Sequence, residues 1–447
     1  MIGKEQAADR LQKALEISGA DETEIVLMVN DMALTRFANN EIHQNVAETN
    51  AVMVIKAADG RRIGSAASND LSDEGIGKVA RRALLHAQQI PEDPDYAGLP
   101  EPQEVPFVDA YDKETGSYSP EARARAVGTI STMASEKGLK AFGAYRTAAR
   151  EVAVANSRGL FAYHPSTVAD LLATISGDAG SGRAQASSWK APEIDAEAVG
   201  LEAIDKALRA QDPQPIDPAP YPVVLDPYAV QDLIQMLAYT GISAQTVQEG
   251  QSWMNGRIGE LVMSPLVTIW DDGQDPGGVP MPFDFEGVPK KRIKIVEEGW
   301  IREPVYDHYT AHKEGKESTG HATPPNMAFI DGPMPANMFM APGNSSIEEM
   351  IKSVDKGLYI TRFWYTRPVH PRDCVVTGMT RDGVYLIEDG VLTNPVKDLR
   401  FTQSYVDAMA QVSAVSRNRR TLISEYGGTE CVPAVKIDSF NFTGITV

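Results

Sequence analysis

Four prolines fall within ten residues near the middle of the chain: Pro213, Pro215, Pro218 and Pro220. Proline fixes its φ angle and lacks a backbone N–H, so such a segment continues neither a helix nor an inner strand. Residues 211–220 are therefore predicted to form a stiff linker. It separates an N-terminal domain, residues 1–210, from a C-terminal domain, residues 221–447.

The N-terminal domain combines helical and extended patterns. Apolar residues with the spacing of one helix face occur at 7–15 and at 76–87. The extended runs between these two helices cover residues 24–29, 33–37, 49–56 and 62–66. A second Pro-rich, acidic stretch, residues 91–106, then divides the domain into subregions of about 1–90 and 107–210. We expect helices and an antiparallel sheet here.

The C-terminal domain is predicted to be mostly strand. A short buried strand at 221–225 leads into a helix at about 228–238. Asp-Gly pairs, which favour tight turns, separate the later apolar runs. The runs at 375–379, 383–387 and 391–396 read as consecutive strands of an antiparallel meander. The fold class is therefore α+β, with a mostly antiparallel β C-terminal domain.

Charge and cysteine content exclude several classes of protein. The chain has 447 residues, 42 Lys and Arg against 61 Asp and Glu, and a formal net charge of −19. Such an acidic chain repels phosphate backbones, so we expect no nucleic-acid partner. Its two cysteines suit reduced thiols in the cytoplasm. Neither a signal peptide nor an apolar run of roughly 18 residues is recognised, so we expect a cytoplasmic protein without a membrane partner.

Metal-like spacing occurs once, at His308 and His312, which are four residues apart and would share a helix face. Glu314 and Glu317 could add ligands, but no Glu follows the first histidine as the general base of a zinc protease would. We therefore interpret these histidines as ordinary surface or loop residues.

Two further pairs of residues carry side chains that could contact a ligand. His370 and Cys374 offer a second, weaker ligand pair. Trp364 and Tyr365 are expected to be core or interface anchors rather than a ligand platform. Gly-rich phosphate loops and a nucleophile elbow are absent from the sequence, so no motif supports nucleotide chemistry or a serine hydrolase.

Short motifs spread over nearly the whole chain resemble those of the TldD/PmbA family, whose members are also named modulators of DNA gyrase. The matching segments are LTRFANNEIH at 34–43, PVVL at 222–225, STGHA at 318–322, GMTRDG at 378–383, IEDG at 387–390, PVKDLR at 395–400, VPAV at 432–435 and FNFTG at 440–444. The resemblance implies a two-part α+β architecture. It also implies a cytoplasmic peptidase system that acts on unfolded or small peptides.

In this family the TldD type carries zinc on the helix after the PVVL strand, through an HExxxH motif and a cysteine near the C-terminus. The TldE or PmbA type lacks the motif and forms a heterodimer with TldD. Here Gln235, Met236 and Tyr239 are assigned to the expected HExxxH positions. Amide, thioether and phenol groups replace neither zinc-binding imidazoles nor a carboxylate base. Cys431 directly precedes Val432 and Pro433, and we do not assign it as the third ligand.

The resemblance therefore implies a metal-free, PmbA/TldE-like subunit with no catalytic residues of its own. Zinc is expected in a TldD-type partner, and unfolded or small peptides are the expected substrates. Three alternatives remain open: a zinc metallopeptidase with a relocated site at His308, His312 and either Cys374 or Cys431; a non-catalytic peptide-binding homodimer; and a tailoring role in natural-product biosynthesis. Substrate-binding residues are not assigned.

Overall fold

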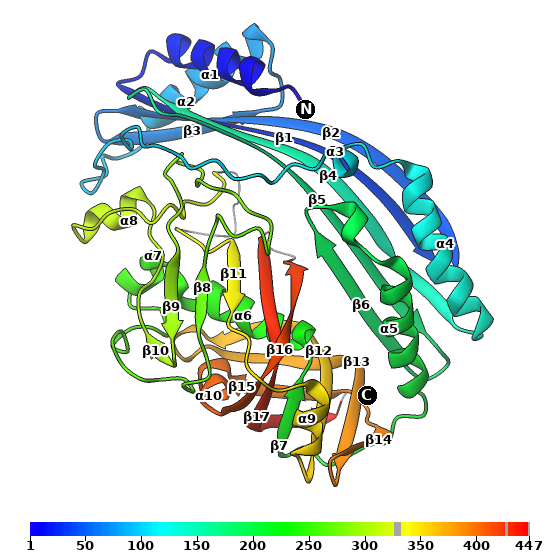
Figure 1. Ribbon diagram of the computed structural model, residues 1–447. Coiled ribbons are helices and arrows are strands. Elements are labelled where there is room, and N and C mark those ends of the chain that lie inside the picture. The colour runs from blue at the N-terminus through cyan, green and yellow to red at the C-terminus, as the bar shows by residue number, and fades with distance from the viewer. Residues whose placement is uncertain (326–331, 425–427, 446–447) are drawn as a thin grey trace.

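The computed structural model describes residues 1–325, 332–424 and 428–445. A long, arched N-terminal sheet lies over the C-terminal half, with its helices on the outer side of the arch (Figure 1). The N-terminal elements are α1 (Lys4–Ser18), β1 (Glu22–Ala38), β2 (Glu41–Asp59), β3 (Arg62–Ser68), α2 (Asp73–Ala87), α3 (Lys113–Gly116), α4 (Pro120–Glu136), β4 (Lys140–Asn156), β5 (Phe161–Ser176), β6 (Ser181–Ser188) and α5 (Ala196–Arg209).

The N-terminal sheet is antiparallel throughout, in the order β3-β2-β1-β4-β5-β6. Because β1 pairs with β4 from Glu24 to Phe37, the two predicted subregions share one sheet. Helices α1 and α2 pack on one end of the sheet, and α4 and α5 pack on the other. The predicted runs 24–29 and 33–37 belong to a single strand, because polar residues also occupy strand positions between them.

The C-terminal elements are β7 (Pro220–Leu225), α6 (Pro227–Leu237), a π-helical turn (Ala238–Ile242), α7 (Ala244–Gln248), β8 (Ile269–Asp271), β9 (Ile293–Glu297), β10 (Trp300–Ile301), α8 (His308–Lys313), β11 (Asn337–Met340), α9 (Ile347–Lys352), β12 (Lys356–His370), β13 (Val375–Glu388), β14 (Val391–Pro395), β15 (Leu399–Ser404), α10 (Tyr405–Ala410), β16 (Val412–Ile423) and β17 (Thr429–Ile445). Among the described residues these strands form one sheet. The pairs β7–β12 and β11–β17 are parallel, and the other described pairs are antiparallel.

The α+β prediction is confirmed, but one predicted turn is wrong. Asp382 and Gly383 lie inside β13, where positive φ angles of 57° and 124° accommodate a bulge opposite Ile360 and Arg362. An Asp-Gly pair in such a bulge looks like a hairpin turn in sequence. Asp389 and Gly390, by contrast, do turn the chain from β13 into β14.

The C-terminal core centres on aromatic side chains between the sheet and α6. Phe363, Phe401, Tyr405 and Phe440 stack with ring centroids between 4.6 and 6.5 Å apart. This core fixes α6 and β12, which form one wall of the cavity described next. In the part of the chain that the structure describes, no helix is long and apolar enough to cross a bilayer.

Candidate functional site

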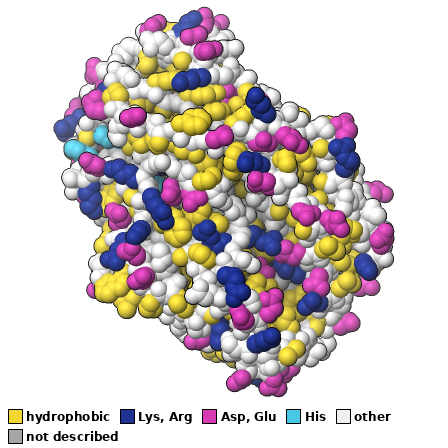
Figure 2. All heavy atoms as spheres, viewed as in Figure 1, with side chains coloured by type: hydrophobic (Ala, Val, Ile, Leu, Met, Phe, Trp, Pro, Cys, Tyr) yellow, Lys and Arg dark blue, Asp and Glu magenta, His cyan; other side chains and the backbone are white. Residues whose placement is uncertain are grey.

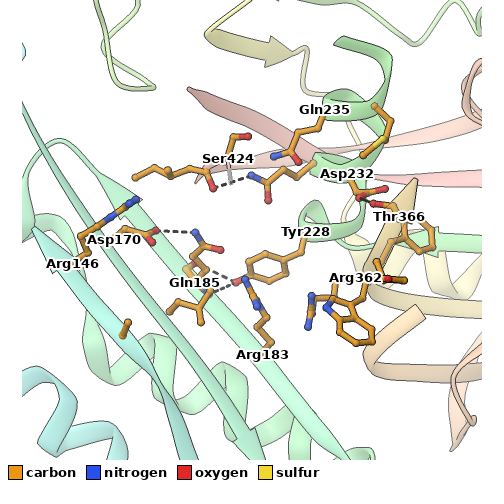
Figure 3. Close-up of a pocket in the computed structure, with 18 of the residues that line it drawn as sticks. Arg146, Asp170, Arg183, Gln185, Tyr228, Asp232, Gln235, Arg362, Thr366 and Ser424 are labelled. Atoms are coloured by element: carbon orange, nitrogen blue, oxygen red, sulfur yellow. Dashed lines mark hydrogen bonds between the residues drawn. The ribbon is translucent and has the colours of Figure 1, made fainter. Parts of the chain in front are cut away.

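A cavity of about 530 Å³ lies between the inner face of the N-terminal sheet and the C-terminal half (Figure 3). Strands β1, β4, β5 and β6 form one wall, and α6, β12 and the end of β16 form the other. Its lining includes Met32, Leu34, Arg36, Ala144, Arg146, Asp170, Leu172, Arg183, Gln185, Tyr228, Gln231, Asp232, Gln235, Met236, Arg362, Phe363, Trp364, Tyr365, Thr366, Ile423 and Ser424.

Helix α6 is positioned by the residue that begins it. Asp226 follows the buried strand β7 and caps the helix, accepting a hydrogen bond from the backbone N–H of Tyr228 at 3.3 Å. Pro227 then occupies the first helical turn, where its missing N–H costs nothing. The Tyr359 hydroxyl also donates to Asp226 Oδ2, at 2.5 Å. The cap thus ties α6 to β12, the neighbouring element of the same wall.

Two glutamines on α6 converge on one buried carboxyl group. Gln231 and Gln235 are four residues apart, and their Nε2 atoms donate to Glu430 Oε2 at 2.9 and 3.3 Å. Glu430 lies on β17 and is buried. Burial raises the pKa of Glu430 to about 7, against the opposing effect of the two amide hydrogen bonds. An amide–carboxyl cluster therefore includes Gln235, the residue assigned to the first histidine of the HExxxH motif.

The other two residues assigned to the motif, Met236 and Tyr239, differ in their exposure to solvent. Met236 is buried and lines the cavity, whereas the Tyr239 side chain is 46% exposed. In HExxxH the second histidine comes five residues after the first. A motif that starts at Gln235 therefore ends at Thr240, one residue after the assigned Tyr239. The Thr240 hydroxyl is buried and donates to the carbonyl oxygen of Met236 at 2.6 Å.

Cys431 is next to Glu430 in sequence, but its side chain packs in a different place. Successive side chains of a strand point to opposite faces of the sheet. Cys431 accordingly packs with Trp270 and Phe339 in a small buried cluster. It is therefore remote from the pair of glutamines on α6, and it does not complete a ligand set with them.

The residues in this region do not fit a zinc ion. Neutral amides are poor zinc ligands, and the carboxyl group of Glu430 is already bonded to both of them. Over residues 1–325, 332–424 and 428–445, no group of three His, Cys, Asp or Glu side chains is arranged to hold a metal. We derive no catalytic step through a metal in this chain.

The relocated candidates are separated by the fold. His308 and His312 lie on the short helix α8, as their spacing predicted, but the two neighbouring acids bind other groups. Glu314 bonds to Tyr306, Gln248 and Lys316, and Glu317 pairs with Lys291. Burial, and then the nearby Lys56 charge, lowers the pKa of His308.

Cys374 is fully buried at a turn between β12 and β13, where burial raises the pKa of its thiol to about 12. Such a thiol is a weak nucleophile and a weak ligand, because the reactive form is the thiolate. His370 is exposed and lies 3.6 Å from the carboxylate of Asp373. The structure therefore brings Cys374 and His370 into no common site.

Two adjacent aromatic side chains line the cavity, although we expected them to be anchors in the core or at an interface. Trp364 and Tyr365 are 41% and 60% exposed. Tyr365 has a φ angle of 55° in an irregular part of β12, and this irregularity lets two successive side chains face the same cavity. Arg381 and Arg367 lie over the rings of Trp364 and Tyr365, respectively.

Sequence reasoning also missed four arginines of the cavity wall: Arg36, Arg146, Arg183 and Arg362. They lie on four different strands, so no sequence motif unites them. The i, i+4 pair of glutamines on a largely apolar helix was a usable signal, since polar residues at that spacing share a face. Nothing in the sequence indicated that Glu430 would lie opposite them.

Replacing Glu430 by Gln is expected to change how stability depends on pH. A raised folded-state pKa means that the carboxyl group stabilises the fold below about 4.5 and that this contribution is lost as pH rises through about 7. The Glu430→Gln variant has no titratable group at this position, so its stability does not fall in this way as pH rises. Between pH 5 and pH 8 it should therefore gain about 2–3 kcal/mol of unfolding free energy relative to the unmodified chain.

Urea denaturation of both proteins at the two pH values measures this difference. Glu260→Gln, at an exposed position, is the matched control and should leave the difference between the two pH values unchanged. Equal pH dependence of the Glu430→Gln variant and the unmodified chain would contradict the prediction.

Comparison with known proteins identifies the family that shares this architecture. Family models match three consecutive parts of the chain: PmbA/TldA metallopeptidase domain 1 over residues 23–87, the central domain over 98–211 and the C-terminal domain over 218–444. The C-terminal match alone covers half of the chain.

Relatives by sequence carry related names. A "Metalloprotease TldD homolog" from Haemophilus influenzae is 30% identical over 178 residues, which is 39% of this chain and 36% of that protein. "Metalloprotease PmbA" from Escherichia coli O157:H7 is 24% identical over 407 residues, 84% of this chain and 83% of that protein. The chain spans less than half the length of the first curated relatives that it matches.

Among solved structures, TldE from Thermococcus kodakarensis has the same fold, with a TM-score of 0.90 at 21% identity, covering 97% of this chain and 100% of that one. The three consecutive family matches and the shared fold agree with the motifs found in the sequence. The chain therefore belongs to the PmbA/TldD metallopeptidase family.

Proposed function

We propose that this chain is the metal-free, TldE/PmbA-like subunit of a cytoplasmic peptide-processing system. In this role it completes the cavity of a TldD-type zinc peptidase and holds an extended peptide there. The observation that carries the proposal is the cluster of Gln231, Gln235 and Glu430, which includes the residue assigned to the first histidine of the motif, within an otherwise complete family fold. The cavity between the two halves offers room for a peptide segment.

The chemistry of the cluster supports a holding role rather than a hydrolytic one. Peptide hydrolysis by a metal enzyme needs an open metal position and a base for the attacking water. Gln231 and Gln235 supply neither, and Glu430 is buried and engaged by both amides. The amides of Gln231 and Gln235 instead line the cavity and offer donors and acceptors that suit the backbone of a peptide.

The first experiment measures the zinc content of the purified full-length chain by elemental analysis after dialysis without a chelator. We expect close to zero zinc per chain and no peptide hydrolysis by the chain alone. A stoichiometry near one zinc, with chelator-sensitive hydrolysis, would overturn the proposal. Alanine substitutions at His308, His312, Cys374 and Cys431 would then locate a relocated site.

The second experiment tests the partner. The tagged chain is mixed with a TldD-type protein from the same source, and the complex is measured by light scattering. We expect a heterodimer whose peptidase activity exceeds that of either chain alone. A stable homodimer that takes up no TldD-type chain would favour the alternative of a non-catalytic peptide-binding homodimer.

A further inference from the structure

We propose that the cavity selects peptides that carry a carboxylate group, and that Arg36 and Arg146 bind this group. The inference rests on the proposed peptide-holding function and names its substrate class. Both guanidinium groups line the cavity from the inner face of the N-terminal sheet. Arginine presents a planar fork of donors that matches the two oxygens of a carboxylate.

The register of two neighbouring strands places the two arginines side by side. In the β1–β4 pair, Leu34 lies opposite Arg146, and Arg36 lies opposite Ala144. Arg36 and Arg146 are thus diagonal neighbours, within reach of one another's long side chains. Leu34 and Ala144, which complete this square, also line the cavity. All four residues therefore face the same space.

An acidic side chain, Asp170, lines the cavity beside this pair but forms no ion pair with it in the described part of the chain. Asp170 lies directly opposite Arg146 on β5, but its Oδ1 accepts hydrogen bonds from Gln185 Nε2 at 2.8 Å and Ser187 Oγ at 2.6 Å. No described carboxylate forms an ion pair with Arg36 or Arg146. Arg362, on the opposite wall, is instead paired with Asp382 at 2.5 Å. Figure 3 shows Asp170 bonded to Gln185.

Neither Arg36 nor Arg146 has an ion-pair partner among the described residues, although the net charge of the chain is −19. The pKa of Arg150, further along β4, is lowered to about 10 by burial and then by the charge of Arg146. The charges of Arg146 and Arg150 therefore interact along this strand. Lys and Arg side chains also border the hollow between the two halves (Figure 2). A cavity of low dielectric focuses such a charge on an anionic ligand.

The carboxylate could belong to an acidic side chain or to the C-terminus of the peptide, and matched peptides distinguish these sources. Three fluorescein-labelled peptides of ten residues share a Gly/Ser background. The first has two internal Glu residues and an amidated end, the second has two Gln and a free end, and the third has two Gln and an amidated end. Their affinity for the full-length chain is measured by fluorescence anisotropy.

We expect one of the charged peptides to bind at least about tenfold more tightly than the neutral one, as a charge-assisted contact provides. This advantage should shrink as salt is raised, because ions screen the attraction. Arg36→Gln and Arg146→Gln should each remove most of the advantage while leaving binding of the neutral peptide unchanged. Arg125→Gln, at an exposed position on α4 outside the cavity, is the control and should leave all affinities unchanged.

The outcomes distinguish failure of the carboxylate inference from failure of the proposed peptide-holding function. Equal affinity for all three peptides, or an advantage that survives both cavity substitutions, would overturn the carboxylate inference alone. Failure of every peptide to bind would overturn the peptide-holding function and the inference with it. Circular dichroism of each variant establishes that the substitutions leave the fold intact.

Discussion

Replacing His321 by Ala is expected to lower the free energy of unfolding by about 3–5 kcal/mol, because it leaves a buried charge without its partner. His321 Nε2 lies 2.9 Å from Asp271 Oδ1, and neither side chain is accessible to solvent. The other oxygen of Asp271 accepts hydrogen bonds from the backbone N–H groups of Ala336 and Asn337 at 2.9 and 2.6 Å. Loss of the imidazole removes one of these three contacts and leaves the buried carboxylate without its side-chain partner.

The pH dependence of the variant gives a sharper test. Burial raises the pKa of Asp271, but the hydrogen bond and charge of His321 outweigh it and hold the pKa below its usual value. In the unmodified chain this carboxylate therefore stabilises the fold above about pH 4 and loses its effect as pH falls. Without His321 the burial effect dominates, so the variant should lose stability as pH rises.

Urea denaturation followed by tryptophan fluorescence measures both effects, since Trp270 precedes Asp271 on β8. His370→Ala is the matched control, because His370 also faces an aspartate but is exposed. A surface pair of that kind contributes about 0–1 kcal/mol. The prediction fails if the two variants are equally stable. A double variant, His321→Ala with Asp271→Asn, should recover part of the loss.

Replacing Arg420 by Ala is expected to cost about 2–3 kcal/mol, after allowance for its partial exposure, and to weaken the contact between the two halves. Arg420 is on β16, and its guanidinium group reaches the N-terminal half at two points. Nη1 donates to the carbonyl oxygen of Gln185 at 3.1 Å, and Nη2 donates to Glu202 at 2.8 Å. Nη1 also donates to the Tyr228 hydroxyl at 2.5 Å.

The same contacts position two residues of the cavity, Gln185 and Tyr228. Burial raises the pKa of Glu202, but Lys206 and Arg420 outweigh that effect and keep the group ionised. Removal of Arg420 therefore leaves a partly buried carboxylate with one cation instead of two. Hydrogen exchange should show faster exchange at the backbone N–H of Gln185, which donates to Tyr228.

The neighbouring Arg419→Ala is the control. Arg419 is exposed and lies 5.8–5.9 Å from the ring centroids of Phe339 and Trp270, which belong to the C-terminal half. Its loss should change neither exchange at Gln185 nor stability by more than about 0.5 kcal/mol. Equal effects of the two substitutions would contradict a specific role for Arg420.

Local patterns in the sequence predicted most of the regular elements. The helix expected at 228–238 is α6, Pro227–Leu237, because apolar spacing and an Asp-Pro start are local signals. The predicted runs 49–56 and 62–66 lie in two strands that form a hairpin, with Gly60 in its turn at a φ angle of 60°. By contrast, residues 41–48 of β2 are mostly polar and almost entirely exposed, so no alternation marked them as strand.

The site could not be predicted in the same way, because its residues meet only in the folded chain. Arg36 and Tyr365 line one cavity although more than 300 residues separate them. Gln235 was identified from the family motif, yet its partner Glu430 carries no sequence signal. Which face of a sheet packs against another element depends on pairing between residues far apart in the sequence. The local spacing of apolar residues does not encode that pairing.

Strand β17 pairs with β7, β11, β15 and β16, so it is the hub of the C-terminal sheet. Asn441 on this strand lies opposite Pro220, which leaves the ribosome 221 residues earlier. The N-terminal sheet needs only residues 22–188 and can assemble while synthesis continues. β12 can pair with one edge of β7 once residue 370 has been made, but the other edge must wait for the last strand. The C-terminal sheet is therefore completed only when synthesis of the described chain is nearly finished.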